Sequence, residues 1–130
     1  MMKKNFLFLL FLFLVACSKE PSLMLTDEEN ETTISVKKGK TVEIILPENP
    51  SNGFRWQFLS SPKNTNLIAN IKETYVPPEG RQIGVSGKKH YIFTVKKEGT
   101  MIIKGYIIRP WEVLDEKKVP KVTYTFEITK

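Results

Sequence analysis

The 130-residue sequence contains one cysteine, Cys17, and one histidine, His90. A single cysteine excludes a disulfide within the chain, and Ser-His or Cys-His catalysis needs a histidine beside the nucleophile. His90 lies in a strand-like segment next to two lysines, and Cys17 is the only cysteine that could partner it. Zinc sites draw on Cys, His and carboxylates at set spacings, and no such grouping occurs. The sequence therefore predicts neither an enzyme nor a metal or cofactor site.

Long apolar runs are also missing, apart from one near the N-terminus. That run extends from Phe6 to Ala16 and follows Lys3 and Lys4. It is shorter than the roughly 20 apolar residues that cross a bilayer, but it has the length and flanks of the apolar core of a secretory signal. The four residues that end at Cys17, Leu-Val-Ala-Cys, resemble the lipobox of bacterial lipoproteins, in which the cysteine becomes the acylated first residue.

Residues 1–16 are therefore predicted to be a lipoprotein signal peptide, and Cys17 the lipidated residue. This places the protein in the bacterial cell envelope, anchored to a membrane by its lipid and facing the periplasm or the exterior. An ordinary signal peptide with an incidental cysteine is the alternative. Residues 17–31 include a proline and an acidic cluster, and they are predicted to form a flexible tether to a domain at residues 32–130.

The sequence also lacks a long run of residues with the same charge. The formal charge is +6 and falls to +4 once Lys3 and Lys4 are removed, but the basic residues occur as scattered pairs. Nucleic-acid binding usually needs a clustered basic patch, so we expect no nucleic-acid partner. About one hundred residues fit a single domain of ordinary size, which we expect to be a monomer.

Apolar residues do not recur at helical spacing over ten residues anywhere in the chain. They alternate with polar residues instead, which is the period of a half-buried β-strand. Segment 122–129 alternates most regularly, whereas 100–108 is more continuously apolar, as in a central strand covered on both faces. Seven segments are predicted to be strands: 32–36, 42–46, 54–58, 66–75, 90–95, 100–108 and 122–129.

Seven short strands separated by turn residues are typical of an all-β fold of the immunoglobulin-like β-sandwich type. A small open β-barrel is the alternative. Trp56 lies on the predicted third strand, where such sandwiches bury a tryptophan, and we expect it in the core. Two connections, 76–88 and 110–118, are longer than the usual length of about 4–6 residues, and long loops on a rigid scaffold often carry function.

The connection from Asn49 to Phe54 has the composition of a stiff, narrow turn. Pro50 fixes its own φ and favours an extended Asn49, and Asn-Gly is the pair best suited to a tight turn with positive φ. Gly53 would also allow another surface to approach the backbone closely. A plain connecting turn is the alternative.

Two further loop segments have the composition of a binding surface. Arg109-Pro110-Trp111 combines the two side chains most enriched in binding hot spots with a stiffening proline; the alternative is that Trp111 folds back over the edge of the sandwich. The segment 84–87 begins and ends with glycine, so its backbone could lie directly against a partner. Connections in these positions can gather at one end of an immunoglobulin-like sandwich, so we predict a single three-loop binding face.

The three motifs together resemble the chagasin family, inhibitors of papain-like cysteine peptidases. That family has Asn-Pro-Thr-Thr-Gly-Phe/Tyr, then Gly-X-Gly-Gly, then Arg-Pro-Trp on an immunoglobulin-like fold. The resemblance covers residues 32–130, and the departures are Ser51 and Asn52 for the two threonines and Ser86 for a glycine. In the family the second threonine approaches the catalytic centre of the peptidase, so Asn52 is the departure that matters most. Ser86 can replace glycine only if its φ is negative.

The resemblance implies a reversible, tight-binding inhibitor of papain-like cysteine peptidases that needs no cofactor. The segment 49–54 would enter the active-site cleft, with the other two loops on either side. The alternative function is that of an immunoglobulin-like envelope or adhesion lipoprotein that binds a different protein. The implied peptidase-binding residues are Asn49, Pro50, Ser51, Asn52, Gly53, Phe54, Gly84, Val85, Ser86, Gly87, Arg109, Pro110 and Trp111.

Overall fold

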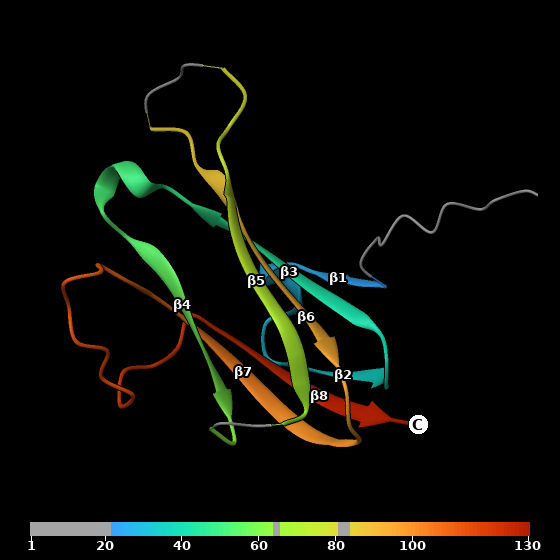
Figure 1. The fold of residues 1–130 in the computed structure, drawn as a ribbon. Helices are drawn as coiled ribbons and strands as arrows, with labels where there is room; N and C mark the ends of the chain where they lie inside the picture. Colours follow the sequence, from blue (N-terminus) through green and yellow to red (C-terminus); the bar gives the residue numbers. More distant parts are fainter. Residues whose placement is uncertain (1–21, 64–65, 81–83) are drawn as a thin grey trace, which may run out of the picture.

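The computed structural model describes residues 22–63, 66–80 and 84–130, which form two four-stranded β-sheets packed face to face (Figure 1). No helix within these ranges is long and apolar enough to cross a membrane. The strands are β1 (Leu23–Leu25), β2 (Thr32–Lys37), β3 (Thr41–Glu48), β4 (Arg55–Ser61), β5 (Ile68–Val76), β6 (Gly87–Val95), β7 (Gly99–Ile108) and β8 (Val122–Thr129). Two single-turn 3-10 helices, η1 (Asp27–Glu29) and η2 (Pro50–Asn52), lie in the connections.

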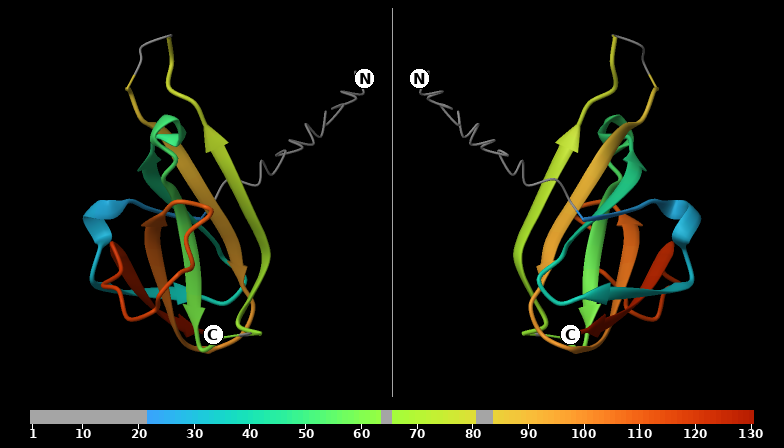
Figure 2. Two further views of the ribbon diagram at one scale, coloured as in Figure 1. Left: turned by 90° about the vertical axis from the view of Figure 1, so that its left-hand side faces the viewer. Right: turned by 90° about the vertical axis from the view of Figure 1, so that its right-hand side faces the viewer.

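The predicted fold class is confirmed as an immunoglobulin-like sandwich. One sheet has the strand order β1-β3-β6-β5 and the other β2-β8-β7-β4, and the two views of Figure 2 show them as separate layers rather than a barrel. β1 pairs with β3 and β2 with β8 in parallel, whereas the other pairs are antiparallel. The seven predicted strands correspond to β2 through β8, with ends displaced by a few residues.

The eighth strand, β1, lies inside the segment predicted to be a flexible tether. Leu25 is only 3% exposed, and β1 pairs with the first half of β3. The tether prediction is therefore wrong for residues 22–31, because a short apolar segment pairs with the edge of β3 and buries a leucine in the core. The predicted signal peptide and the lipidated Cys17 lie outside the described residues.

A buried phenol also ties this N-terminal segment to the second sheet. The Tyr124 hydroxyl of β8 donates a hydrogen bond to the Thr26 carbonyl oxygen at 2.7 Å. Burial, together with the Glu29 and Asp27 carboxylates, raises the pKa of Tyr124, so the hydroxyl keeps its proton and remains a donor. The segment thus contacts both sheets, with β1 in one of them and Thr26 bonded to the other.

The core follows the alternation of the sequence. Val42, Ile44 and Leu46 of β3 are fully buried, and so is Phe126 on the opposite sheet. Phe93 of β6 meets Phe126 edge-on across the sandwich, with ring centroids 5.6 Å apart. Aromatic contacts of this geometry add to the free energy gained from apolar burial, so the two sheets are joined by specific contacts as well as by hydrophobic area.

Trp56 lies at the margin of the core rather than fully inside it. Its side chain is half-buried, packs against the core residues and stacks on Phe58 with centroids 6.3 Å apart. The indole Nε1–H donates to the Pro47 carbonyl oxygen at 2.8 Å. Because Pro47 and Trp56 lie on either side of the 49–54 connection, this bond closes the base of that loop.

Leu25→Ala is expected to lower the free energy of unfolding by about 2–4 kcal/mol, because it removes a buried side chain and leaves a cavity. Met24→Ala is the matched control, since the adjacent Met24 side chain is 58% exposed and its loss should cost less than about 1 kcal/mol. Urea denaturation of both variants measures the difference. Equal, small effects would mean that β1 is not part of the folded domain.

Candidate functional site

The connection between β3 and β4, residues 49–54, is a compact turn held by its own side chains. Asn49 has an extended backbone, and its Oδ1 accepts hydrogen bonds from the Ser51 N–H at 3.2 Å and the Ser51 hydroxyl at 2.6 Å. Gly53 adopts a left-handed conformation with φ of 82°, and its N–H donates to the Pro50 carbonyl oxygen at 3.0 Å. The extended Asn49 and the positive φ at Gly53 confirm the backbone predicted from the sequence.

Asn52 helps to hold the same turn. Its Oδ1 accepts a hydrogen bond from the Phe54 N–H at 3.0 Å, while the residue itself is exposed. Asn52 belongs to η2, so the positive φ falls on Gly53 alone, and the tip is one 3-10 turn closed by glycine. No described residue accepts a hydrogen bond from the Asn52 Nδ2 group, which leaves that donor available to a partner.

The connection between β7 and β8 contacts this turn through Arg109. The guanidinium carbon lies 4.7 Å from the centroid of the Phe54 ring and 5.8 Å from that of Trp111. Both distances fall within the range of cation–π attraction. Arg109 therefore joins two loops that are more than fifty residues apart in the sequence. Its role here is to hold the loops together.

Trp111 is 71% exposed, so it does not fold back into the sandwich. Its ring nevertheless rests against the tip, because a Cβ added at Gly53 would lie 3.1 Å from Trp111 Cη2. Glycine at this position thus serves two purposes: it permits the positive φ and it leaves room for the indole. The remaining surface of the ring faces solvent.

The third predicted segment, 84–87, reaches the same end of the sandwich. Gly84, Val85 and Ser86 are exposed, whereas Gly87 is buried and pairs with Glu48 at the end of β3. A Cβ at Gly87 would collide with the Val76 carbonyl oxygen and the Tyr75 side chain, so glycine is needed there for close packing. Ser86 has no positive φ, so its backbone is one that a non-glycine residue adopts readily.

Figures 1 and 2 show how the three connections are arranged. In Figure 1 the β3–β4 connection with η2 lies between the β5–β6 connection at the top and the β7–β8 connection at the left. Figure 2 shows the first two side by side at the top of the molecule. Two contacts join the segments at this end, as predicted: Trp111 lies against Gly53, and Gly87 pairs with Glu48 at the base of the tip.

Glu48 also belongs to this region, although no sequence motif pointed to it. It is 1% exposed, and its Oε2 accepts a hydrogen bond from the Trp56 N–H at 2.8 Å. Glu48 thus connects the end of β3 to β6 through the sheet and to β4 through its side chain. The alternation that buries Ile44 and Leu46 places Glu48 on the same face, and this was the signal that could have found it.

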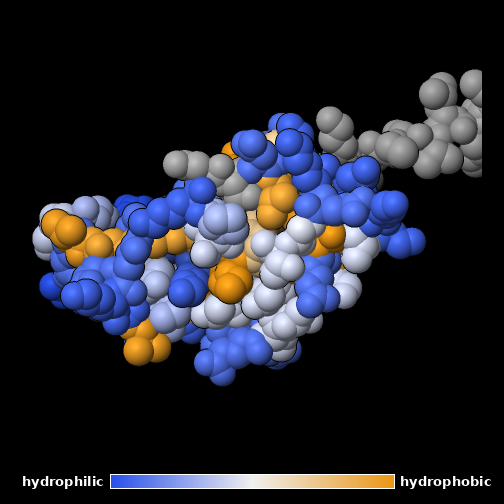
Figure 3. Space-filling model, turned by 90° about the horizontal axis from the view of Figure 1, so that it is seen from below, coloured by the Kyte–Doolittle hydropathy of each residue, from blue (hydrophilic) through white to orange (hydrophobic). Residues whose placement is uncertain are grey.

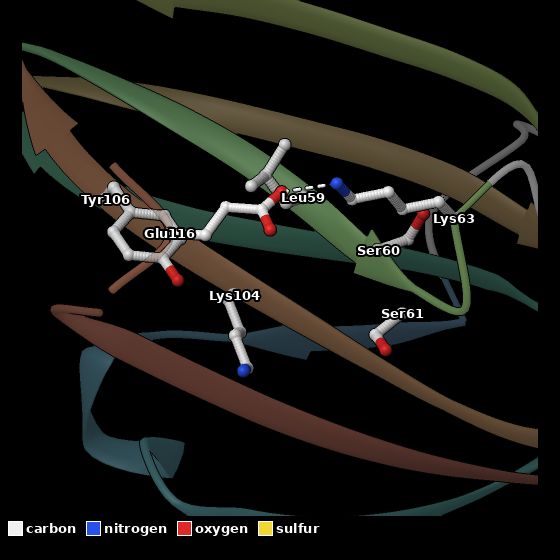
Figure 4. Close-up of a pocket in the computed structure, with 7 residues that line it drawn as sticks. All are labelled: Leu59, Ser60, Ser61, Lys63, Lys104, Tyr106 and Glu116. Carbon is white, nitrogen blue, oxygen red and sulfur yellow. Dashed lines mark ion pairs between the residues drawn. The ribbon is translucent and has the colours of Figure 1, made fainter. Parts of the chain in front are cut away.

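The β7–β8 connection folds back over the outer face of the second sheet. Tyr106 is 4% exposed and Ile108 is 8% exposed, although both alternate with the core-facing residues of β7. Tyr106 lies beside Glu116 of the loop, whose carboxylate is 2.6 Å from Lys63 Nζ (Figure 4). This covering explains why β7 is apolar on both faces, as its sequence predicted.

The one histidine pairs with a carboxylate inside a sheet. His90 lies on β6, and its Nδ1 is 2.5 Å from Glu43 Oε1 of the neighbouring β3. Within residues 22–63, 66–80 and 84–130, no three Cys, His, Asp or Glu side chains lie close enough together to hold a metal ion.

An immunoglobulin-like sandwich that presents three converging loops defines a protein-recognition module. Residues 35–128 match the sequence profile described as chagasin family peptidase inhibitor I42. The chain therefore belongs to the chagasin family, whose members inhibit peptidases and are not themselves enzymes. The family predicted from the three motifs is confirmed, whereas the lipoprotein form of the chain is still a prediction.

Individual proteins show the same relationship. Chagasin of Trypanosoma cruzi is 35% identical over 88 residues, which cover 66% of this chain and 80% of chagasin. Amoebiasin-1 of Entamoeba histolytica is 33% identical over 93 residues, which cover 68% of this chain and 84% of amoebiasin-1. The crystal structure of EhICP2, a cysteine protease inhibitor from Entamoeba histolytica, aligns with a TM-score of 0.63 at 24% identity. That alignment covers 85% of this chain and all of EhICP2, and it supports the fold.

Gly53→Ala is expected to displace Trp111, because the added methyl group has too little room beside the indole. Gly39→Ala is the matched control: Gly39 also has a positive φ, but nothing lies within 4 Å of an added Cβ. Both variants should lose about 1–2 kcal/mol of stability from backbone strain. In a Trp56→Phe background, only Gly53→Ala should alter the tryptophan fluorescence and its quenching by acrylamide. Identical spectra for the two variants would argue against the contact.

Proposed function

We propose that this chain is a reversible, tight-binding inhibitor of papain-like cysteine peptidases, and that its three loops occlude the active-site cleft of the target. The observation that carries the proposal is the convergence of the loops. Trp111 rests on Gly53, and Gly87 pairs with the residue that precedes the tip. Membership of the chagasin family supports a peptidase as the partner.

The tip is suited to block a cleft without being cut. Residues 50–52 form a folded turn closed by Gly53 and present no extended scissile bond. Extending this segment would break the hydrogen bonds that Asn49 and Asn52 accept within the loop. We infer that the tip occupies the cleft as a folded turn and covers the catalytic residues of the target.

Asn52 is the tip residue that would lie nearest those catalytic residues. Its side-chain oxygen Oδ1 already accepts a hydrogen bond from the Phe54 N–H, so the side chain cannot rotate freely without losing that bond. Its Nδ2 group would therefore point a pre-positioned donor at the target. Replacement of the family threonine by asparagine keeps a polar tip while exchanging a hydroxyl for an amide donor.

Affinity would come mainly from loops that are ordered before binding. Side chains and loops that become fixed on association cost about 0.5–1.5 kcal/mol for each rotamer-rich side chain. Arg109 already holds Phe54 and Trp111 in place, so part of the side-chain entropy is already lost in the free protein. An interface of about 1,600 Å² in total is expected for a protease–inhibitor pair.

Trp111→Ala is expected to raise the inhibition constant for papain by about 30-fold, equivalent to ~2 kcal/mol, because hot-spot tryptophans contribute at least this much. Trp111→Phe retains an aromatic ring and should lose less. The measurement is competitive inhibition of papain by the chain lacking residues 1–17. An unchanged constant for Trp111→Ala would remove Trp111 from the binding site, and no inhibition by the parent chain would exclude the proposed function.

We also propose that the inhibitor domain is held in the bacterial cell envelope by a lipid on Cys17. The support is the lipobox-like sequence at the end of the apolar run and the absence of any other cysteine. Cys17→Ser is expected to move the chain from the membrane fraction to the soluble fraction of the producing cells. Met24→Ser serves as the control and should stay with the membranes. A parent chain found in the soluble fraction would contradict the proposal.

A further inference from the structure

Exposed apolar side chains are concentrated on the two outer loops of the described structure. Five of the seven large apolar residues that are exposed lie on or at the start of the β5–β6 and β7–β8 connections. The central tip carries polar side chains instead, those of Asn49, Ser51 and Asn52. The seven exposed residues are Met24, Ile71, Val76, Val85, Trp111, Val113 and Val119.

Val113 and Val119 are the most exposed of this set, at 90% and 85%. Neither valine belongs to the three sequence motifs that predicted the binding loops. Figure 3 shows the molecule from below, and hydrophobic side chains stand among hydrophilic ones at its left-hand end, the end at which the β7–β8 connection lies in Figure 1. Single exposed valines are common on protein surfaces, so their location is what has to be explained.

The β7–β8 connection is held in place by backbone hydrogen bonds. The Glu112 N–H donates to the Arg109 carbonyl oxygen at 3.0 Å, and the Lys118 N–H donates to the Asp115 carbonyl oxygen at 3.0 Å. At its far end the Lys121 N–H donates to the Gly105 carbonyl oxygen of β7 at 2.9 Å. The two valines are therefore presented to solvent by a loop whose path is held by several backbone bonds.

The surface around Val119 is continuous with the three-loop face. Val119 lines a hollow together with Phe54, Tyr106, Ile107 and Ile108, and with the charged side chains of Glu112, Lys118 and Lys121. Phe54 is the residue on which Arg109 stacks. A partner seated on Trp111 would therefore extend over this hollow. The chain thus carries exposed apolar side chains on the β7–β8 connection beyond the Arg-Pro-Trp segment, beside charged groups.

We propose that Val113 and Val119 extend the docking face and bind an apolar strip on the rim of the target's active-site cleft. This inference rests on the proposed function and names the chemistry of the partner: a peptidase with a polar cleft floor and a nonpolar rim on the side that the β7–β8 connection covers. Burial of exposed valine surface on binding supplies a non-directional contribution to affinity, so these residues select targets by the polarity of that rim.

The test compares two double variants of the full chain in competitive inhibition of papain. Val113→Ser with Val119→Ser is expected to raise the inhibition constant by about tenfold or more, because both side chains lose apolar contact. Met24→Ser with Ile71→Ser is the matched control, since these side chains are also exposed, at 58% and 55%, but lie on β1 and β5. The control is expected to inhibit like the parent chain.

Urea denaturation separates a binding effect from a folding effect. Because Val113 and Val119 are almost fully exposed, their replacement should leave the midpoint of unfolding unchanged. Equal inhibition constants for the valine double variant and the parent chain would overturn this inference and leave the proposed function standing. A parent chain that fails to inhibit would overturn both.

Discussion

The relative positions of the β3–β4 and β5–β6 connections depend on the hydrogen bonds made at the end of β3. Glu48 pairs with the first residue of β6 through its backbone and with the N–H of Trp56 on β4 through its buried carboxylate. The indole of Trp56 in turn donates to Pro47. Because a buried polar group without a partner costs free energy, these bonds resist rearrangement. The base of the tip and the start of β6 are therefore held at one fixed separation, and the loops that emerge from them share one end of the sandwich.

Residues of the loop face divide into those that hold it and those that remain available to a partner. Asn49 accepts two hydrogen bonds within the tip, and Arg109 lies against two aromatic rings. Trp111 and Val113 face solvent. An arginine in such a face is often expected to pair with an acidic partner, but here its attraction to the rings is used within the molecule. Rigid loops lose little entropy on binding, which suits a protein that binds as a folded unit.

Most of the fold could be predicted because burial in a sandwich follows a period of two residues, and seven strands are long enough to show it. β1 was missed because three residues are too few to show a period, and the acidic cluster that follows it suggested a solvated segment. Glu48 was missed because carboxylates are mostly exposed, although it continues the buried series of β3. Trp56 was expected inside the core, but its indole Nε1–H donates to the Pro47 carbonyl oxygen at the loop base, which keeps the ring at the core margin.

The sequence by itself determined the local geometry of the tip. Pro50 and Gly53 restrict the backbone wherever they occur, so an extended Asn49 followed by a glycine-closed turn could be read from six consecutive residues. Only the tertiary structure decided that Trp111 rests on Gly53 and stays exposed, and that Tyr106 is covered by its own loop. Backbone preferences act between neighbours in the chain, whereas burial and ring contacts depend on which distant segments the packed sheets bring together.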